Sequence, residues 1–269
     1  MSTKIEWTDE TWNPVVGCSK VTEGCRYCYA MKQAHRNAAM AQQQYIGLTE
    51  KRASGVEWTG LVRTVPSMLE KPLGWKNPRM IFVNSMSDLF HPDVPFDFID
   101  QVFAVMALCK RHTFQILTKR PQRMLEYMRS VEERGDSWRS VIYNPSPVNV
   151  TGLELPLPNV WLGVSVENQL TADARIPILL QTEAAVRWLS MEPLLGDVDI
   201  EAYLVDLPED GDGAPYLGGI DWVVVGGESG HHDRPMDPIW ARSLRDQCAA
   251  AGVPFLFKQW GDGKEWGMA

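Results

Sequence analysis

The sequence lacks long apolar runs and has only five cysteines, and each of these features excludes a class of protein. No stretch approaches the roughly eighteen apolar residues that a membrane-spanning helix needs. The opening residues MSTKIEWTDETW are polar and acidic and contain no apolar segment of a secretory signal. An odd number of unevenly spaced cysteines argues against a disulfide framework. We therefore expect a soluble, cytoplasmic protein.

Positive charge is also scarce. The chain has 26 Lys and Arg residues against 34 Asp and Glu residues, which gives a net charge of −8. This balance argues against a broad phosphate-binding surface, because nonspecific binding of nucleic acid relies on Lys and Arg. A local basic patch is still compatible with it, and the candidate residues are Lys110, Arg111, Lys119, Arg120 and Arg123. Five tryptophans are candidate stacking surfaces for a base, although packing is their usual role: Trp7, Trp12, Trp58, Trp75 and Trp260.

Short apolar runs alternate with helix-like segments along most of the chain. Uniformly apolar runs separated by helices are typical of a parallel sheet that is buried on both faces. Together they predict about seven strands and favour an α/β fold, a partial or complete parallel (β/α) barrel. An open doubly wound sheet is the alternative, because one sequence does not reveal strand order. The runs lie within residues 11–17, 79–90, 113–121, 159–168, 186–196, 221–230 and 254–261.

We expect one domain over residues 1–269 with three insertions. Residues 45–78 suggest a lid, and the proline-rich residues 136–158 suggest an extended loop. Residues 197–220 are strongly acidic and suggest a solvated insertion. The last helix-like segment, 238–252, is predicted to stop at Gly252, since glycine is common just past a helix end.

Polar and charged side chains follow most of the predicted strands. Parallel α/β folds bind ligands at the carboxyl ends of their strands, so we expect these groups to meet at one mouth. Helix N-capping by Ser, Asp and Asn is the alternative, but it does not account for the carboxylates and cations. In chain order the residues are Ser85, Ser87, Asp88, Thr118, Lys119, Arg120, Ser165, Glu167, Asn168, Ser190, Glu192, Glu228, Ser229, Lys258 and Gln259.

Three of the five cysteines fall in the short stretch GCSKVTEGCRYCYA, directly after the first predicted strand. Thiolates are soft ligands that suit zinc or an iron–sulfur cluster. A structural zinc site needs a fourth ligand, and His35 lies about two turns along the next predicted helix, on the wrong side. The remaining two, Cys109 and Cys248, occupy apolar, helix-like segments and are interpreted as buried packing residues. A [4Fe–4S] cluster held by three cysteines would leave one iron open to a second ligand.

The cysteine loop resembles that of the radical S-adenosylmethionine (SAM) superfamily. Its spacing is C-x6-C-x2-C, three residues longer in the first interval than the usual C-x3-C-x2-C, and Tyr27 supplies the aromatic residue before the last cysteine. The chain is most similar to an uncharacterised family of phage and bacterial radical-SAM-like proteins, distantly related to spore photoproduct lyase-type enzymes. The blocks that carry this resemblance are WTDETWNPVVGC, FVNSMSDLFH, GVSVENQ, ARIPILL, MEPLLG, WVVVGGESG and FLFKQWG.

The resemblance implies two cofactors. Cys18, Cys25 and Cys28 would hold a [4Fe–4S] cluster, and SAM would bind its open iron. Tyr27 would pack beside the cluster or the adenine, with core packing as the alternative. An electron from a donor such as flavodoxin or ferredoxin would split SAM into methionine and a 5′-deoxyadenosyl radical. The radical would act on a substrate, and nucleic acids and nucleotides are the candidate substrates.

The resemblance also implies a division of the strand-end residues. The second predicted strand lacks the superfamily's GGE-like motif and ends in NSMSD instead. The expected SAM-binding residues are Ser85, Ser87, Asp88, Ser165, Glu167, Asn168 and Arg175, the last being a carboxylate partner or simply a helix-surface arginine. The expected catalytic residues are Lys119, Glu192, Glu228 and Lys258. The alternative function is a zinc- or iron–sulfur-stabilised binding or redox-sensing protein that does not cleave SAM.

Overall fold

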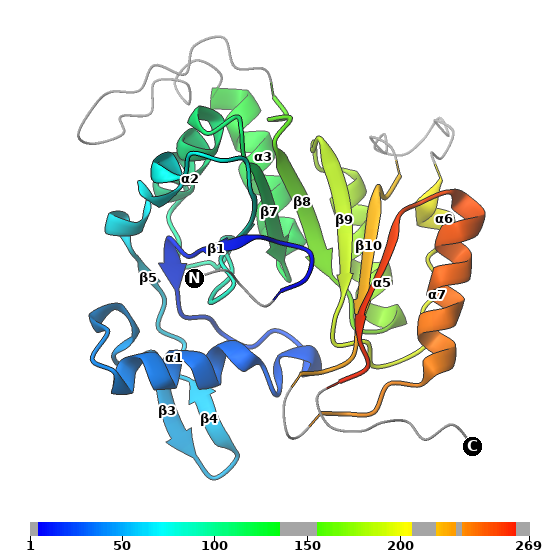
Figure 1. The fold of residues 1–269 in the computed structure, drawn as a ribbon, viewed down its shortest axis with the longest axis horizontal. Helices are drawn as coiled ribbons and strands as arrows, with labels where there is room; N and C mark the ends of the chain where they lie inside the picture. The colour runs from blue at the N-terminus through cyan, green and yellow to red at the C-terminus, as the bar shows by residue number, and fades with distance from the viewer. Residues whose placement is uncertain (1–4, 135–154, 206–218, 230–232, 262–269) are drawn as a thin grey trace.

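A computed structural model describes residues 5–134, 155–205, 219–229 and 233–261 of the chain. Its main feature is a sheet of seven strands, all parallel, in the order β1-β6-β7-β8-β9-β10-β11. The sheet curls into an open half-barrel with β1 and β11 at its two edges (Figure 1), which confirms the predicted partial (β/α) barrel. The strands are β1 (Glu10–Trp12), β6 (Met80–Val83), β7 (Thr113–Thr118), β8 (Val160–Ser165), β9 (Val186–Met191), β10 (Trp222–Gly226) and β11 (Phe255–Gln259).

Helices follow most of these strands. They are α1 (Tyr29–Ala39), α2 (Phe96–Leu108), α3 (Pro121–Arg134), α5 (Gln169–Leu180), α6 (Glu201–Leu204) and α7 (Pro238–Ala251). Of these, α2, α3, α5 and α7 cover the convex face of the sheet, whereas α1 lies beyond the carboxyl ends of the strands (Figure 1). As predicted, α7 stops at Gly252, whose φ of 70° is left-handed and therefore favours glycine. No helix in the described part of the chain has the length and apolar character to cross a bilayer.

Side-chain alternation along the strands creates two hydrophobic cores. On β6, Ile81 and Val83 point to the helices, whereas Phe82 points into the half-barrel. On β9, Leu189 belongs to the helix-side core and Trp188 to the inner one. This alternation follows from the two-residue period of a strand. Both faces of the sheet are therefore apolar near its middle, as a buried parallel sheet requires.

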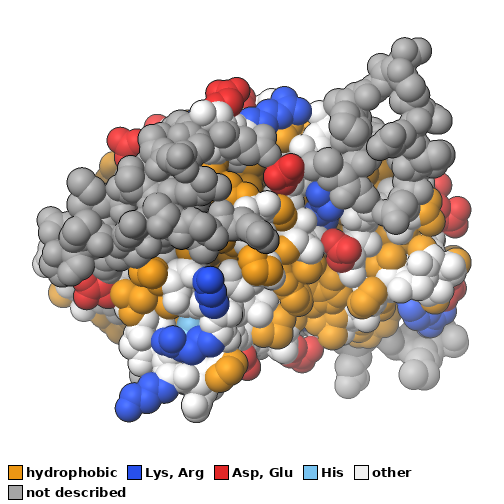
Figure 2. Space-filling model, turned by 90° about the horizontal axis from the view of Figure 1, so that it is seen from above, with side chains coloured by type: hydrophobic (Ala, Val, Ile, Leu, Met, Phe, Trp, Pro, Cys, Tyr) orange, Lys and Arg blue, Asp and Glu red, His pale blue; other side chains and the backbone are white. Residues whose placement is uncertain are grey.

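The inner core is an aromatic floor near the amino ends of the strands. Trp7 packs edge-on against Trp188 with ring centroids 5.1 Å apart, and Trp188 stacks on Trp222 at 5.3 Å. Gly163 on β8 makes room, since a Cβ there would lie 2.5 Å from the Nε1 of Trp188. Hydrophobic side chains also gather in the middle of the face seen in Figure 2. The floor fills the half-barrel near the amino ends of the strands, and the cavity lies toward their carboxyl ends.

The first predicted strand is split in two, and the first insertion folds as small elements outside the main sheet. The run 11–17 is split at Pro14, which has no backbone N–H to donate, so only β1 joins the main sheet. Residues 45–78 fold as small elements, and Tyr45, Leu48 and Trp58 pack against α1. The elements outside the main sheet are β2 (Val15–Val16) with β5 (Arg63–Thr64), the hairpin β3 (Thr49–Arg52) and β4 (Gly55–Trp58), and the 3₁₀ turns η1 (Glu23–Cys25), η2 (Gln43–Tyr45), η3 (Pro66–Met68) and η4 (Lys71–Gly74).

The other two insertions are only partly described. Residues 136–154 of the proline-rich segment lie outside the described residues, as do residues 206–218 of the acidic one. Within 197–220, the acidic Asp197, Asp199 and Glu201 are exposed, but Ile200 and Leu204 are buried in the helix-side core. The described part of this insertion therefore exposes its acidic residues, as expected, and is anchored to the core by its apolar ones.

Candidate cofactor site

The cysteine loop connects β2 to α1 at the carboxyl ends of β1 and β6, as predicted. It begins at Gly17, which bridges to Ser87 beyond β6. Gly17 has a φ of 89°, and a Cβ there would lie 2.3 Å from the carbonyl oxygen of Leu61, so only glycine fits. The loop passes through η1 and ends at Cys28, the N-cap of α1.

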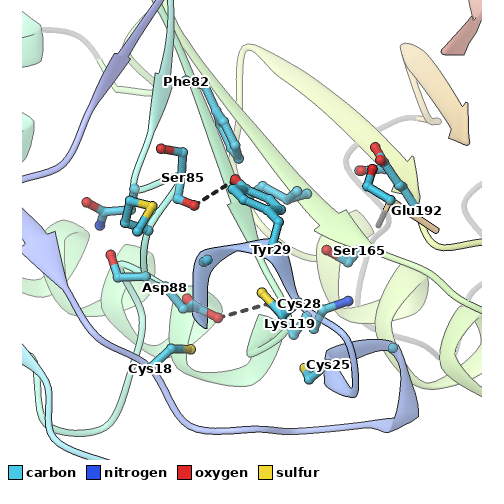
Figure 3. Close-up of a pocket in the computed structure, with 18 of the residues that line it drawn as sticks. Cys18, Cys25, Cys28, Tyr29, Phe82, Ser85, Asp88, Lys119, Ser165 and Glu192 are labelled. Atoms are coloured by element: carbon cyan, nitrogen blue, oxygen red, sulfur yellow. Dashed lines mark hydrogen bonds between the residues drawn. The ribbon is translucent and has the colours of Figure 1, made fainter. Parts of the chain in front are cut away.

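All three loop thiols line one cavity of about 770 Å³ in the hollow end of the half-barrel (Figure 3). None of the chain's cysteines forms a disulfide. Burial raises the pKa of Cys18 to about 12 and also raises the pKa of Cys28, and Cys25 adds to both effects. The thiols are therefore close enough to interact electrostatically.

The three thiols that line the cavity are soft sulfur donors, of the kind that bind zinc or an iron–sulfur cluster. Within the described residues, no group of three or more His, Cys, Asp or Glu side chains is arranged to hold one metal ion.

Asp88 and Arg120 lie beside Cys18. Asp88 is buried, accepts a hydrogen bond from the Thr118 hydroxyl at 2.8 Å, and pairs with the Nη1 of Arg120 at 2.8 Å. The same Nη1 lies 3.9 Å from the Sγ of Cys18, and the Nη2 donates to the carbonyl oxygen of Ser19 at 3.0 Å. Asp88 thus holds the guanidinium of Arg120 in place, and Arg120 links the start of the cysteine loop to the end of β7.

Glu167 lies just past the carboxyl end of β8 and is 1% exposed. Its Oε1 accepts hydrogen bonds from the Nζ of Lys119 and, at 3.1 Å, from the Thr22 hydroxyl, while its Oε2 accepts from Arg175 at 3.0 Å. Burial opposes the negative charge, but Lys119 and Arg175 outweigh it and lower the pKa of Glu167. Gly24 packs on the same side chain, because a Cβ there would lie 2.5 Å from the Cγ of Glu167. The middle of the cysteine loop therefore rests on Glu167.

Glu228 and Arg234 secure the loop from the side of β10. The Glu228 carboxylate accepts from the Nε of Arg234 at 2.8 Å and from its Nη2 at 2.5 Å. The Nη2 also donates to the carbonyl oxygen of Glu23 at 3.0 Å. The guanidinium carbon lies 5.5 Å from the ring centroid of Tyr27, a cation–π distance. The Tyr27 ring, which belongs to the loop, thus packs against the Arg234 guanidinium.

The wall opposite Cys18 carries an ion pair between two strands. The Nζ of Lys258 on β11 donates to the Oε1 of Glu192, after β9, at 2.6 Å. Gly226 on β10 clears space beside it, since a Cβ there would lie 3.4 Å from the Glu192 carboxyl carbon. Ser165 and Ser190 pair in register on β8 and β9 and line the same cavity. Figure 3 shows Ser165 and Glu192 on the side away from Cys18. This wall presents a cation, a carboxylate and two hydroxyl-bearing side chains.

The near wall is built from the start of α1 and the residues after β6. The Tyr29 hydroxyl donates to the carbonyl oxygen of Ser85 at 2.7 Å (Figure 3). The Ser85 hydroxyl donates to Asn13 at 3.1 Å, and the Ser87 hydroxyl donates to the carbonyl oxygen of Val15 at 2.8 Å. The side chain of Tyr29 is 49% exposed, so the cavity is open beside it. Both serine hydroxyls thus also hold the wall together.

Twelve of the fifteen predicted site residues line this cavity, and three do not. Asn168 caps α5 by accepting from the backbone N–H of Thr171 at 3.1 Å, which is the capping alternative. Arg175 is buried, not on the helix surface, and binds Glu167 and the Ser165 carbonyl oxygen. Glu167 is the third. The twelve are Cys18, Cys25, Tyr27, Cys28, Ser85, Ser87, Asp88, Lys119, Ser165, Glu192, Glu228 and Lys258.

Sequence reasoning missed several residues of the site. Tyr29 follows Cys28 directly, and that adjacency was an available signal. Gly24 and Thr22 lie inside the loop, but only their contact with Glu167 reveals a role. Arg234 gave no signal, because it reaches Glu23 across 211 positions of sequence.

The predicted basic patch stays a prediction: Lys110 and Arg111 are exposed, whereas the three arginines also make contacts within the chain. Arg120 pairs with Asp88, Arg111 donates to the carbonyl oxygen of Trp75 at 2.8 Å, and Arg123 donates to that of Val94 at 2.6 Å.

Lys119 is likewise paired with Glu167. Of the five tryptophans considered for stacking, Trp7, Trp12 and Trp58 are buried and Trp75 is half-buried, whereas Trp260 is exposed. Packing therefore accounts for most of them.

The sequence matches one family model over residues 2–268, that of a family described as "Protein of unknown function (DUF5131)". The chain belongs to the DUF5131 family. The match takes in every residue of the cavity described above. No curated protein matches the sequence.

Two solved structures are similar to this DUF5131 protein in fold. One is a cysteine-to-serine mutant of spore photoproduct lyase, with a TM-score of 0.47 and 9% identity. The other is spore photoproduct lyase complexed with dinucleoside spore photoproduct, with a TM-score of 0.46 and 10% identity. Each match covers 96% of this chain and 78% of the lyase chain.

Proposed function

We propose that this DUF5131 protein is a radical SAM enzyme that binds a [4Fe–4S] cluster through Cys18, Cys25 and Cys28. The observation that supports it is the set of three thiols lining one cavity at the carboxyl end of the half-barrel. The chain's other cysteines, Cys109 and Cys248, are fully buried in the helix-side core, and no histidine is among the described residues that line the cavity. Three ligands leave one iron of the cluster open, which is the position that SAM needs.

Cluster and SAM together would supply a carbon-centred radical that removes hydrogen from an otherwise unreactive substrate. The chain's own contribution is to position these groups and to exclude water. Trp7, Phe82 and Leu117 line the cavity from the aromatic floor and close it to solvent at the amino ends of the strands. Polar side chains such as Ser165, Glu192 and Lys258 line the cavity at the carboxyl ends of the strands, where they can orient a ligand.

The proposed roles of the wall residues follow from their contacts. Ser165, beside the loop anchor Glu167, and Tyr27 are proposed to bind SAM. Glu192 and Lys258 are proposed to bind and orient the substrate, because they line the wall away from Cys18 and contact each other. Lys119 and Glu228, expected to be catalytic, already neutralise Glu167 and Arg234 and so shape the wall as well.

Two partners belong to the proposal. A one-electron donor such as flavodoxin or ferredoxin would reduce the cluster. A nucleotide or nucleic acid is the first substrate class to test, because bases stack on aromatic rings such as Tyr27 and Tyr29, which line the cavity. An affinity that falls steeply with salt would indicate phosphate contacts.

The test is cofactor loading followed by SAM cleavage. Protein reconstituted without oxygen is expected to hold about four irons with matching sulfide. After reduction with dithionite it should convert SAM to 5′-deoxyadenosine and methionine, detected by chromatography. Stoichiometric zinc without iron–sulfur absorbance would overturn the cluster assignment. A loaded cluster that yields no 5′-deoxyadenosine with DNA, RNA or protein substrates would instead identify a binding or redox-sensing protein.

A further inference from the structure

We propose that Glu167 is a positioning residue that holds the cysteine loop in place, with Lys119 and Arg175 acting through it. This inference rests on the proposed function in one respect only, namely that the group bound by the cysteine loop is a [4Fe–4S] cluster. Glu167 is not among the described residues that line the cavity. Its carboxylate is turned into the wall, toward the loop.

Two contacts of different kinds bring the loop onto this one side chain. The Thr22 hydroxyl donates to the Oε1 of Glu167 at 3.1 Å. The backbone at Gly24 comes so close that a Cβ would lie 2.5 Å from the Cγ and 2.6 Å from the Oε1 of Glu167. Both contacts lie between Cys18 and Cys25, the interval that is three residues longer than in the radical SAM motif. We infer that the longer interval needs an anchor at its middle and that Glu167 is this anchor.

Glu167 is itself held from several sides. Its backbone N–H donates to the Thr171 hydroxyl at 2.9 Å, and its carbonyl oxygen accepts from the N–H of Leu195 at 2.7 Å. Lys119 binds one carboxylate oxygen and Arg175 the other. Removing the carboxylate would leave two cations with side-chain exposures of 19% and 6% without their partner, a costly arrangement. Because these contacts fix the Glu167 side chain, Glu167 in turn fixes the position of the cysteine loop that packs against it.

The contact between Gly24 and Glu167 gives the proposal a sharp test. Gly24→Ala adds a methyl group that collides with Glu167 and pushes the loop away. Glu167→Ala removes the colliding atoms, so the added methyl should do less harm in that background. Residues that touch in this way show non-additive effects in a double-mutant cycle. A loop that did not depend on Glu167 would respond to the two changes independently.

The experiment compares wild type, Gly24→Ala, Glu167→Gln, Glu167→Ala and the Gly24→Ala/Glu167→Ala double variant. In metal-free protein, the rate at which iodoacetamide alkylates each cysteine is followed by mass spectrometry. The buried Cys109 and Cys248 report global opening within the same sample. Glu10→Gln is the matched control, because it breaks a partly buried ion pair with Arg79 (2.9 Å) away from the loop. Iron uptake on anaerobic reconstitution is measured in parallel.

We expect Glu167→Gln and Gly24→Ala each to speed alkylation of Cys25 several-fold, with Cys109 and Cys248 unchanged and Glu10→Gln like wild type. The Gly24→Ala/Glu167→Ala variant should label Cys25 more slowly than the product of the separate Gly24→Ala and Glu167→Ala effects predicts. Unchanged Cys25 labelling in both single variants would overturn the proposal, as would parallel acceleration at all five cysteines or fully additive effects. Failure of the wild type to take up iron would instead defeat the proposed function, because the labelling result does not depend on a cluster.

Discussion

The guanidinium of Arg120 lies 3.9 Å from the Sγ of Cys18 while it donates to Asp88 at 2.8 Å. A cation that donates toward a cysteine sulfur stabilises negative charge on that sulfur and on anything bound to it. Reduction of an iron–sulfur cluster adds negative charge, so hydrogen bonds to the sulfurs raise its potential. Arg120 is therefore in a position to favour the reduced state of a cluster bound to Cys18.

The first prediction is that Arg120→Gln lowers the reduction potential of the reconstituted cluster. The expected change is on the order of 60 mV, the one-electron equivalent of about 1.4 kcal/mol. A redox titration followed by electron paramagnetic resonance measures it. Arg123→Gln is the control, since Arg123 donates to the Val94 carbonyl oxygen and not to the loop. Equal potentials in wild type and Arg120→Gln would show that the contact does not tune the cluster.

The second prediction separates the two classes of cysteine. Alanine at Cys18, Cys25 or Cys28 should abolish stoichiometric iron binding, measured by iron analysis and absorbance. Alanine at Cys109 or Cys248 should leave iron content unchanged and lower the free energy of unfolding by about 1 kcal/mol through lost packing. Denaturant titration gives the second value. Iron loss in Cys109→Ala or Cys248→Ala would reveal a fourth ligand and remove the open position.

The third prediction concerns the ion pair across the far wall. Lys258→Met should keep the cluster but lower the rate of substrate-dependent 5′-deoxyadenosine formation roughly tenfold or more, equivalent to about 1.4 kcal/mol. The reason is that the Glu192 carboxylate then loses its 2.6 Å partner and the wall loses its cation. Rates with and without substrate, at equal iron content, provide the measurement. A variant as active as wild type would place the substrate elsewhere.

The fourth prediction is a loss of stability in mild acid. His112 is buried and its Nε2 donates to the carbonyl oxygen of Pro72 at 3.2 Å. Burial, helped by Arg111 and Arg79, lowers its pKa below the usual 6.5, so the unfolded chain binds a proton more readily than the folded one. Neutral His112 makes its full contribution to stability at pH values above the ordinary pKa of 6.5. This contribution is lost as the pH falls through the lowered pKa that His112 has in the folded protein.

Urea unfolding at about pH 5.5 and about pH 7.5 should therefore give a lower free energy of unfolding at the acidic value. His112→Phe should reduce the difference, since it removes the titrating group. The buried His91, whose pKa is also lowered by burial, should still contribute to the pH dependence of the unfolding free energy in that variant. An unchanged pH dependence in His112→Phe would assign the acid sensitivity to other groups.

Much of the architecture could be predicted because it depends on local pattern. The apolar runs ending near Thr118, Ser165 and Gly226 became strands β7, β8 and β10, and Gly252 ended α7 as expected. The two-residue period of a strand also explains why Trp188 and Leu189 face opposite sides. The break at Pro14 was overlooked, although the missing N–H of proline predicts it.

The sequence by itself determined that three cysteines share one loop, that the loop follows the first parallel strand, and that polar groups follow the other strands. Only the tertiary structure decided which of those groups face the cavity. Ser165 lies within β8, where alternation sets its direction, and it lines the cavity. Glu167 lies beyond the strand, where the path of the chain sets the direction, and it turns to Thr22 across 145 positions. Partners so far apart in the sequence meet only after the sheet has curled, and local pattern carries no information about that encounter.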